Sequence, residues 1–402
     1  MSQAIKRRTF LTAAGLAAAQ DKPLGVAAIG VGNRGFFLLK EFQNLPGVEV
    51  RVICDLYDGN LRRAKEFSKN TRAAYTKKWE EAIAAPGVDA VVIATPDFWH
   101  APMALAAARA RKDIYLEKPL CMTVAEAKQL RAAVRENKVV LQLGHNRNSA
   151  APLFKAREIY RSGKLGAVPL IRTYIDRAHA RPPWKFYTDA QVLEMPKDAS
   201  PQTIDWDRFL GGKAKRPFDA EQFFRWRGWW EFSTGVAGDL MSHLWDSVNM
   251  IAGMGIPRTC MTHGALYFWK NEIHVPDMWH AVFDYPNREL TVTFNQAFHN
   301  SHYGDVVQVL GREGTMEAGP AFCRVWGPEW RERQKAPNYV FKPGELEVSS
   351  HWQDFVDSIR TRATPRCGID RAFEEAVTIA MSIEAYRRRR EVRWDANKEE
   401  IV

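Results

Sequence analysis

The stretch Gly25-Val-Ala-Ala-Ile-Gly-Val-Gly-Asn-Arg-Gly35 decides the fold of this chain. Three of its glycines, Gly30, Gly32 and Gly35, have the spacing G-x-G-x-x-G between an apolar, strand-like run and a helical pattern at 36–42. In a dinucleotide-binding unit the first glycine permits a tight turn, the second lets the backbone approach a pyrophosphate, and the third packs the helix closely on the strand. The free N–H groups at the helix start then face the phosphates. We therefore predict a dinucleotide site at this turn.

A carboxylate stands where such a site needs one. The second apolar run, 48–54, ends in Asp55, which is about 20 residues beyond the last glycine, as the fingerprint requires. Asp55 is expected to accept a hydrogen bond from the ribose 2′-hydroxyl, and it would repel the 2′-phosphate of NADP, so NAD is favoured over NADP. Arg62 and Arg63 weaken this preference slightly, although they lie further into the following helix.

Strand-like and helical patterns alternate over residues 23–148, which we assign to a dinucleotide-binding Rossmann domain with a doubly wound parallel sheet. The apolar runs are 48–54, 90–94, 113–116 and 139–143, and the helical patterns are 59–69, 101–111 and 124–136. Ligands of such sheets lie beyond the carboxyl ends of the strands, where Asp55, Thr95 and the segment 117–119 fall.

The pattern changes after residue 148, so residues 149–390 are predicted to form an α+β domain that binds substrate and mediates oligomerisation. A long segment rich in proline and tryptophan, roughly 177–234, has no clean periodicity. Period-2 segments then indicate a large, mostly antiparallel open sheet. The expected strands are 168–175, 259–268, 280–285, 290–298 and 306–310, the expected helices are 151–162, 239–250, 353–360 and 372–386, and 391–402 is left as a C-terminal tail.

Composition excludes several classes of protein. The net charge of +10 is spread along the 402 residues without a nucleic-acid-binding motif, so no nucleic-acid partner is expected. The five cysteines are widely spaced and contain no C-x-x-C, which argues against a disulfide framework or a zinc site. The pair His299-x-x-His302 lacks carboxylate support, and we expect no metal. No apolar run reaches the ~20 residues that span a bilayer.

The first 20 residues read as a leader. Arg7-Arg8 followed by Phe10-Leu11 and the small, alanine-rich run 13–19 is similar to a twin-arginine export signal. This predicts export to the periplasm as a folded protein, or a cytoplasmic protein if the leader does not function.

Two groups of residues carry candidate chemistry. Glu117-Lys118-Pro119 follows a strand of the cofactor domain, where a lysine could stabilise negative charge on a reacting oxygen or simply form a surface ion pair. Asp239 and His243 are four apart in a helical pattern, so the carboxylate could orient the imidazole as a general base. Asp246 is also within reach of His243, and spacing does not decide which carboxylate orients it.

Taken together, these motifs resemble the Gfo/Idh/MocA oxidoreductases over nearly everything from Leu24 onward. The motifs are Gly30-x-Gly32-x-x-Gly35, Thr95-Pro-Asp-Phe-Trp-His100, Glu117-Lys-Pro119, Gly238-Asp-x-x-x-His243 and, typical of the bacterial branch, Tyr267-x-x-Lys-x-Glu-x-x-x-Pro-Asp277. The resemblance implies a Rossmann domain followed by an α+β domain, a nicotinamide cofactor, sugars, cyclitols or their acids as substrates, and a homo-oligomer (dimer or tetramer).

The resemblance also implies the roles of individual residues. Lys118 would be the catalytic lysine, His243 the acid/base and Asp239 its polar companion. The cofactor would be bordered by Gly30, Gly32, Asn33, Arg34, Gly35, Asp55, Thr95, Pro96, His100, Glu117, Lys118 and Asn146. Many relatives have a glutamine in a Gly-x-Gln-x-Arg segment, whereas this chain has Gly144-His-Asn-Arg-Asn148, so Asn146 would meet the carboxamide instead. Guanidinium groups bind carboxylates and indole faces stack on sugar rings, and we assign Arg147, Arg225 and Trp230 to the substrate.

Three functions remain open at this point. The first is an NAD-dependent dehydrogenase acting on a secondary hydroxyl of a sugar, cyclitol or sugar acid. The second is an NAD-dependent glycosidase that oxidises a ring hydroxyl transiently, eliminates the aglycone and restores the hydride. The third is a nucleotide-retaining binding protein without turnover, which the complete set Lys118, Asp239 and His243 disfavours.

Overall fold

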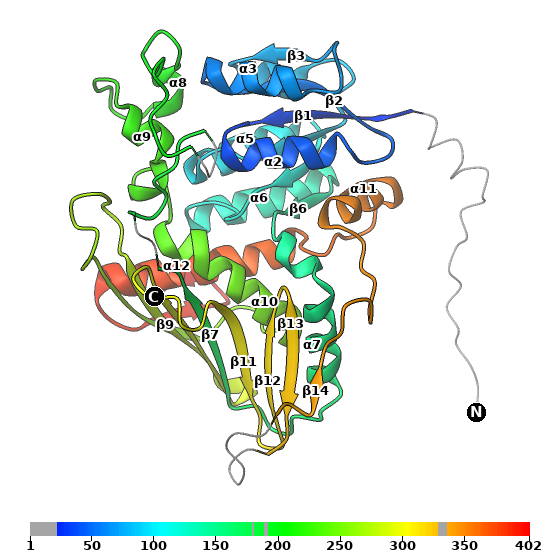
Figure 1. The fold of residues 1–402 in the computed structure, drawn as a ribbon, viewed down its shortest axis with the longest axis vertical. Coiled ribbons are helices and arrows are strands. Elements are labelled where there is room, and N and C mark those ends of the chain that lie inside the picture. The colour runs from blue at the N-terminus through cyan, green and yellow to red at the C-terminus, as the bar shows by residue number, and fades with distance from the viewer. Residues whose placement is uncertain (1–21, 179–180, 189–191, 329–335) are drawn as a thin grey trace.

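The computed structural model describes residues 22–178, 181–188, 192–328 and 336–402, so the expected leader lies outside the described residues. The first domain is a parallel sheet of strand order β3-β2-β1-β4-β5-β6 with helices packed around it (Figure 1). Its strands are β1 (Leu24–Ile29), β2 (Val48–Cys54), β3 (Ala74–Thr76), β4 (Ala90–Ile93), β5 (Asp113–Leu116) and β6 (Leu141–Leu143). Its helices are α2 (Asn33–Phe42), α3 (Asp58–Phe67), α4 (Trp79–Ala84), α5 (Asp97–Arg109) and α6 (Val124–Asn137). This confirms the predicted Rossmann sheet.

The order of these strands creates the binding crevice. Strands β4 and β5 are buried along their whole length, which is why they read as continuous apolar runs rather than as alternating ones. The chain winds outward from β1 through β2 to β3, and then returns to place β4 on the other side of β1. Ligands of open α/β sheets bind at such a reversal, beyond the carboxyl ends of the strands.

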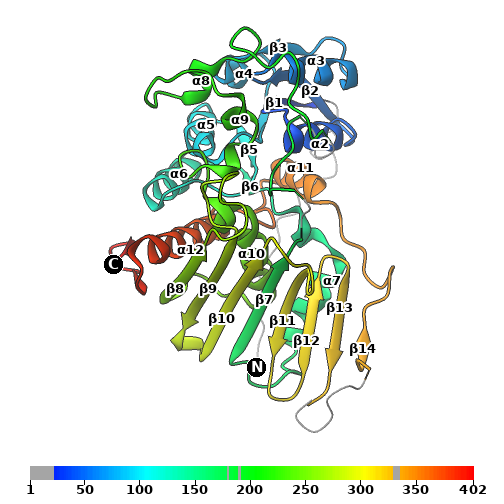
Figure 2. The same ribbon diagram turned by 60° about the vertical axis from the view of Figure 1, so that its left-hand side comes forward.

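The second domain contains, within the described residues, a ten-stranded sheet of order β14-β13-β12-β11-β7-β10-β9-β8-β15-β16. The pair β10–β7 is parallel and the other pairs are antiparallel, as predicted for a mostly antiparallel sheet. Figure 2 shows this sheet below the first domain. Its strands are β7 (Leu170–Asp176), β8 (Thr259–Ala265), β9 (Met278–Tyr285), β10 (Leu290–Ala297), β11 (Asp305–Leu310), β12 (Thr315–Gly319), β13 (Phe322–Trp326), β14 (Tyr339–Val340), β15 (Val392–Asp395) and β16 (Glu400–Ile401).

The end of the chain belongs to this sheet as well. Residues 391–402, assigned from the sequence to a tail, contribute β15 and β16, and β15 pairs with β8. Strand β15 is only four residues long, with buried Val392 and Trp394 alternating with Arg393 and Asp395. Such a short run gives a weak periodic signal next to the arginine-rich helix end.

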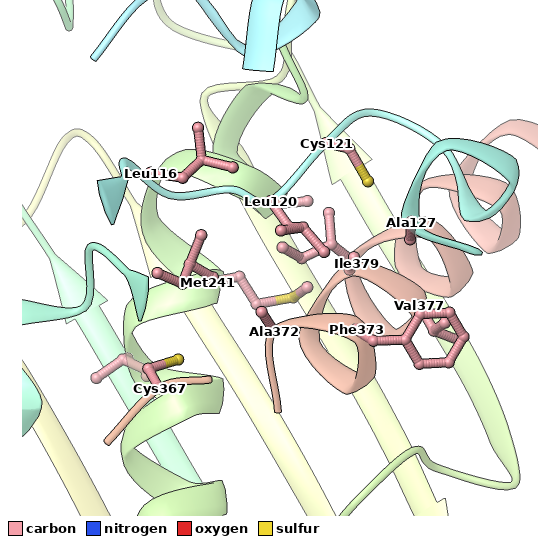
Figure 3. Close-up of a cluster of buried hydrophobic side chains, with 14 of the residues drawn as sticks. Leu116, Leu120, Cys121, Ala127, Met241, Cys367, Ala372, Phe373, Val377 and Ile379 are labelled. Atoms are coloured by element: carbon pink, nitrogen blue, oxygen red, sulfur yellow. The ribbon is translucent and has the colours of Figure 1, made fainter. Parts of the chain in front are cut away.

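Helices of the second domain join the two domains into one core. They are α7 (Ala151–Arg161), α10 (Ser242–Ala252) and α12 (Ile369–Arg388), whereas α11 (His351–Thr361) packs through Phe355 in a separate cluster with residues of the first domain. Figure 3 shows Leu116 and Leu120 of the first domain beside Met241 and the α12 residues Phe373 and Ile379, in one continuous cluster of buried side chains. Because one core spans both domains, the residues that each domain brings to the crevice have fixed relative positions.

The aperiodic segment of the second domain returns to the nucleotide edge of the first. Ile204 forms a β-bridge with Tyr57, and Asp205 donates its N–H to the carbonyl of Leu56. The indole of Trp99 donates to the carbonyl of Phe209, in the short helix α8 (Trp206–Leu210). Figure 2 shows α8 and α9 (Ala220–Phe224) beside the helices of the first domain. No helix of the described residues is long and apolar enough to cross a membrane.

Candidate active site

The glycine turn has the geometry that a dinucleotide requires. Gly30 has a φ of +80°, and a Cβ there would lie 2.8 Å from the carbonyl oxygen of Ala94. A Cβ on Gly35 would lie 1.6 Å from the carbonyl oxygen of Gly30, so only glycine lets α2 approach β1. A Cβ on Gly32 would make only an ordinary van der Waals contact, 3.7 Å from the side chain of Asn60. This is where a pyrophosphate would approach, at the end of a helix whose first N–H groups receive no side-chain cap.

A cavity lies against this turn, and its lining fits a nucleotide. The buried hydroxyl of Thr95 has no hydrogen-bond partner within the part of the chain that the structure describes, and aromatic rings supply stacking surfaces. The cavity contains the sequence-predicted Gly30, Gly32, Asn33, Arg34, Asp55, Thr95 and Pro96, together with Trp79, Trp99, Phe209 and Trp226. The residues present therefore fit the group that the glycine motif implies.

Asp55 is buried just after the end of β2, and most of its acceptor positions are used by hydrogen bonds within the protein. It accepts hydrogen bonds from the N–H groups of Val31 and Tyr57, at 2.8 and 2.9 Å, and from the side chain of Asn60 at 3.1 Å. A carboxylate has about four acceptor positions, so one remains for a ribose hydroxyl. These bonds fix the carboxylate beside the glycine turn.

The catalytic candidates from the two domains meet at a second cavity of about 840 Å³. The ammonium group of Lys118, after β5, donates to the Oδ1 of Asp239 at 2.9 Å and to its backbone carbonyl at 2.7 Å. Asp239 also accepts from the indole of Trp184 at 2.7 Å and from Arg227 at 3.4 Å. Burial alone would raise the pKa of Asp239, but the charges of Lys118 and Arg227 and the hydrogen bonds hold it well below its usual value.

Asp239 lies in a π-helical turn, η3 (Ala237–Met241), that leads into α10. Such turns are rare and are frequent at functional sites. A Cβ on Gly238 would lie 1.7 Å from the hydroxyl of Thr234, which itself donates to Asp97. A glycine is therefore required beside Asp239, because Thr234 fills the space where a side chain would stand.

The expected pairing of a carboxylate with His243 is wrong in this structure. Asp239 is engaged by Lys118, Trp184 and Arg227, and Asp246 pairs with Arg371. The buried Nδ1 of His243 has no hydrogen-bond partner among the described residues. The wider π-helical turn changes the angle between successive side chains, so residues four apart no longer share one face.

Burial and the surrounding charges both favour the neutral form of His243. Burial lowers the pKa of His243 well below its usual value, and the nearby cations Lys118, Arg147 and Arg177 lower it further. A neutral imidazole with an uncommitted nitrogen is the form that accepts a proton.

The segment that departs from the resemblance, 144–148, contributes to both cavity and core. Asn146 accepts a hydrogen bond from Arg34 at 3.0 Å, and Arg34 also pairs with Glu117 at 2.6 Å. Arg147 pairs with Asp305 of β11 and lines the larger cavity with Asn146. His145 is fully buried behind them, and its ring lies 5.5 Å from that of His243.

Four predicted site residues lie outside the lining of both cavities: Gly35, which packs α2 against the glycine turn, and His100, Arg225 and Trp230. His100 contacts two backbone carbonyls, that of Pro119 through Nδ1 at 2.6 Å and that of Thr95 through Nε2 at 2.9 Å. It therefore links the two loops of the crevice that contain these residues. Arg225 is buried and pairs with Glu221 of α9, the helix that ends just before it, and with Glu272. Trp230 stacks on Tyr386 of α12, with ring centroids 5.9 Å apart.

Sequence reasoning missed three side chains that the structure brings to the reactive centre. Trp184 and Arg227 bind Asp239, and Arg177 shares Asp305 with Arg147. All three lie in the aperiodic segment or at its border, where no periodicity indicates which side chains face inward. The density of tryptophan and arginine in 177–234 was the only available signal.

A Rossmann sheet with a glycine turn, followed by an α+β domain that supplies a second wall, defines an NAD-binding oxidoreductase. Residues 24–145 match the description "Oxidoreductase family, NAD-binding Rossmann fold", and 212–393 and 151–256 match its C-terminal alpha/beta domain in two forms. The chain belongs to the Gfo/Idh/MocA oxidoreductase family.

A curated relative matches part of the chain. A glycosyl hydrolase family 109 protein of Shewanella sp. (strain MR-4) is 38% identical over 136 residues, which cover 32% of this chain and 30% of that protein. The chain therefore aligns with less than a third of that relative's length.

Solved structures show the same fold over most of the chain. An aldose–aldose oxidoreductase from Caulobacter crescentus, complexed with glycerol, has a TM-score of 0.70 at 19% identity, covering 92% of this chain and 100% of that one. A levoglucosan dehydrogenase, in complex with NADH and levoglucosan, has a TM-score of 0.70 at 17% identity, covering 92% and 99%.

Proposed function

We propose that the protein is an NAD-dependent dehydrogenase that transfers hydride between the cofactor and a secondary hydroxyl or ketone of a sugar, cyclitol or sugar acid. The observation that carries this proposal is the contact of Lys118 with Asp239 beside neutral His243, at the meeting point of the two domains. The names of the sugar-active structural relatives give it further support.

The mechanism follows from the charges in the cavity. A bound nicotinamide dinucleotide supplies the hydride acceptor or donor. His243 takes the hydroxyl proton of the substrate, and Lys118 stabilises the negative charge that develops on its oxygen. Asp239 holds the lysine in place, and Trp184 and Arg227 in turn bind the carboxylate of Asp239. In the reverse direction the carbonyl carbon of a ketone would accept the hydride, while Lys118 stabilises the charge on its oxygen and His243 supplies the proton.

The preference for NAD over NADP rests on Asp55. Its carboxylate lines the nucleotide cavity, where it would repel a 2′-phosphate. Of the nearby arginines, Arg62 pairs with Asp198. Arg63 lies at the glycine turn itself, where it donates to the carbonyls of Val31 and Gly32 as well as to that of Thr188, and its charge reduces the preference that Asp55 sets.

The alternative is an NAD-dependent glycoside hydrolase that acts by transient oxidation and elimination. It is favoured by the identity to the glycosyl hydrolase family 109 protein. Both reactions begin with oxidation of a ring hydroxyl, so His243 and Lys118 have the same roles in that step.

One experiment separates the two functions. The protein is purified without added cofactor, and its absorbance and fluorescence are recorded while sugars, cyclitols and aryl glycosides are titrated. Stoichiometric NADH formation with a polyol or sugar supports the dehydrogenase. Aglycone release without lasting NADH formation moves the protein to the glycosidases, and no response of either kind refutes both.

Two further proposals concern the location of the protein in the cell and its oligomeric state. The twin-arginine-like leader at 1–20 supports export to the periplasm. The solvent-facing side of the ten-stranded sheet carries the exposed apolar side chains Met261 and Val282, which supports a homo-oligomer formed through this face.

A further inference from the structure

The larger cavity has an excess of positive charge. Its lining includes three acidic side chains, namely Asp97, Glu117 and Asp239. Against them stand more cationic ones, namely Arg34, Lys118, Arg147, Arg177, Arg181, Lys185 and Arg227. A cavity of one sign concentrates ligands of the opposite sign.

Ion pairs within the protein do not cancel this excess. Lys118 and Arg227 share the single carboxylate of Asp239. On the side formed by β7 and the segment 146–149, Arg147 and Arg177 likewise share the single carboxylate of Asp305. Two guanidinium groups on one carboxylate leave one positive charge uncompensated at that place.

The two arginines also have the exposure that a substrate site needs. The side chains of Arg147 and Arg177 are 27% and 33% exposed, and both line the cavity. Asp305 fixes one side of each guanidinium group, which leaves other N–H groups to bind a ligand. A planar guanidinium matches a carboxylate with two parallel hydrogen bonds.

Their charges act on the reacting centre. After burial and Lys118, Arg147 and Arg177 are among the groups that lower the pKa of His243. An anion on these arginines would offset that effect and make His243 a better base when the substrate is bound. A neutral sugar would leave the imidazole under the full positive field.

We propose that the substrate is an acidic sugar, of the uronic or aldonic acid class, whose carboxylate binds Arg147 and Arg177 beside Asp305. This inference rests on the proposed function, because it names the substrate of the same cavity. It predicts that a sugar acid binds more tightly and is oxidised faster than the neutral sugar that matches it in every other group.

The test uses the full-length holoenzyme and matched pairs of compounds: hexuronates with hexoses, and hexonates with hexitols. Rates of NADH formation and binding by calorimetry are measured for wild type, Arg177→Gln and the control Arg109→Gln. Arg109 is an exposed residue in the last turn of α5, outside the cavity. Loss of a charged hydrogen bond predicts a roughly tenfold or larger drop in kcat/KM for acids in Arg177→Gln, with neutral sugars and the control nearly unchanged.

The outcomes separate this inference from the proposed function. NADH formation with neutral sugars in preference to acids would retain the dehydrogenase and overturn the acidic substrate. Equal losses for acids and neutral sugars in Arg177→Gln would also overturn it. If no compound is oxidised, the dehydrogenase fails, and calorimetry still decides whether acids bind more tightly than their neutral partners.

Discussion

Lys118 of the first domain donates a hydrogen bond to Asp239 of the second at 2.9 Å, across 121 positions of sequence. A further bond of 2.7 Å to the backbone carbonyl of Asp239 means that the lysine is held by both the side chain and the π-helical turn. The turn continues directly into α10, which carries His243. The proposed acid/base and the proposed electrostatic residue are thus positioned by one element.

Replacing Lys118 with Met should remove the chemical step and leave cofactor binding nearly intact. The apolar side chain keeps much of the volume but cannot stabilise charge on the substrate oxygen, so kcat should fall by roughly 10²- to 10⁴-fold. Single-turnover absorbance measures the step, and NADH fluorescence titration measures binding. Lys128→Met, at an exposed site on α6, is the control. Cofactor loss in parallel with activity would contradict the assignment.

Replacing Asp239 with Asn should destabilise the fold as well as slow the reaction. The change leaves Lys118 and Arg227 without their common carboxylate, and breaking a buried ion pair costs about 3 kcal/mol. Because the pKa of Asp239 is lowered in the folded state, its contribution is complete above the unfolded pKa of about 4 and is lost as the pH falls below it. Urea unfolding at several pH values should therefore show that the difference in the free energy of unfolding between wild type and variant becomes smaller in acid. A difference in unfolding free energy that does not change with pH would argue that the charge of the Asp239 carboxylate does not stabilise the fold.

The glycine turn offers a matched pair of substitutions. Gly35→Ala places a Cβ 1.6 Å from a backbone oxygen and should prevent α2 from packing on β1, with a loss of roughly 3 kcal/mol or more from overpacking. Gly32→Ala has free space and a φ of −65°, so it should fold normally and weaken NAD binding. Thermal unfolding and NADH titration distinguish the two effects. Normal NAD affinity in Gly32→Ala would place the pyrophosphate elsewhere.

The parts of the fold that sequence predicted are those fixed by local physics. Buried parallel strands such as β4 must be apolar throughout, and strands such as β10 must alternate because one face meets the core. Strand β5, predicted at 113–116, has those bounds in the structure. The glycine turn was predictable because steric clashes leave few residues that fit it.

The parts that sequence did not predict depend on contacts between distant segments. Trp184 reaches Asp239 only because the aperiodic segment folds back over the crevice. The π-helical turn at 237–241 has no periodic signature, so Asp239 was placed beside His243 rather than beside Lys118. The burial of His145 against Glu375 arises when α12 closes over the first domain, which no local pattern records.

That last pair predicts an unusual dependence of stability on pH. The Nε2 of His145 and the Oε2 of Glu375 lie 2.5 Å apart, and both side chains are fully buried. Burial lowers the pKa of His145 to about 4 and raises that of Glu375 well above its usual value, so burial favours the uncharged form of both side chains. The unfolded chain binds more protons at His145 between about pH 6.5 and 4, which lowers stability as the pH falls through that window.

Glu375 acts in the opposite direction, because the folded state keeps a proton that the unfolded state loses above about pH 4.3. Its contribution to stability therefore declines as the pH rises towards the folded pKa. Glu375→Gln keeps the shape and removes this ionisation, so its stability relative to wild type should rise steadily from pH 5 to 8 in urea titrations. Glu384→Gln, in an exposed ion pair with Arg388 of the same helix, should show no such trend. A pH-independent difference for Glu375→Gln would mean that Glu375 is ionised in the folded protein and that the buried pair carries charge.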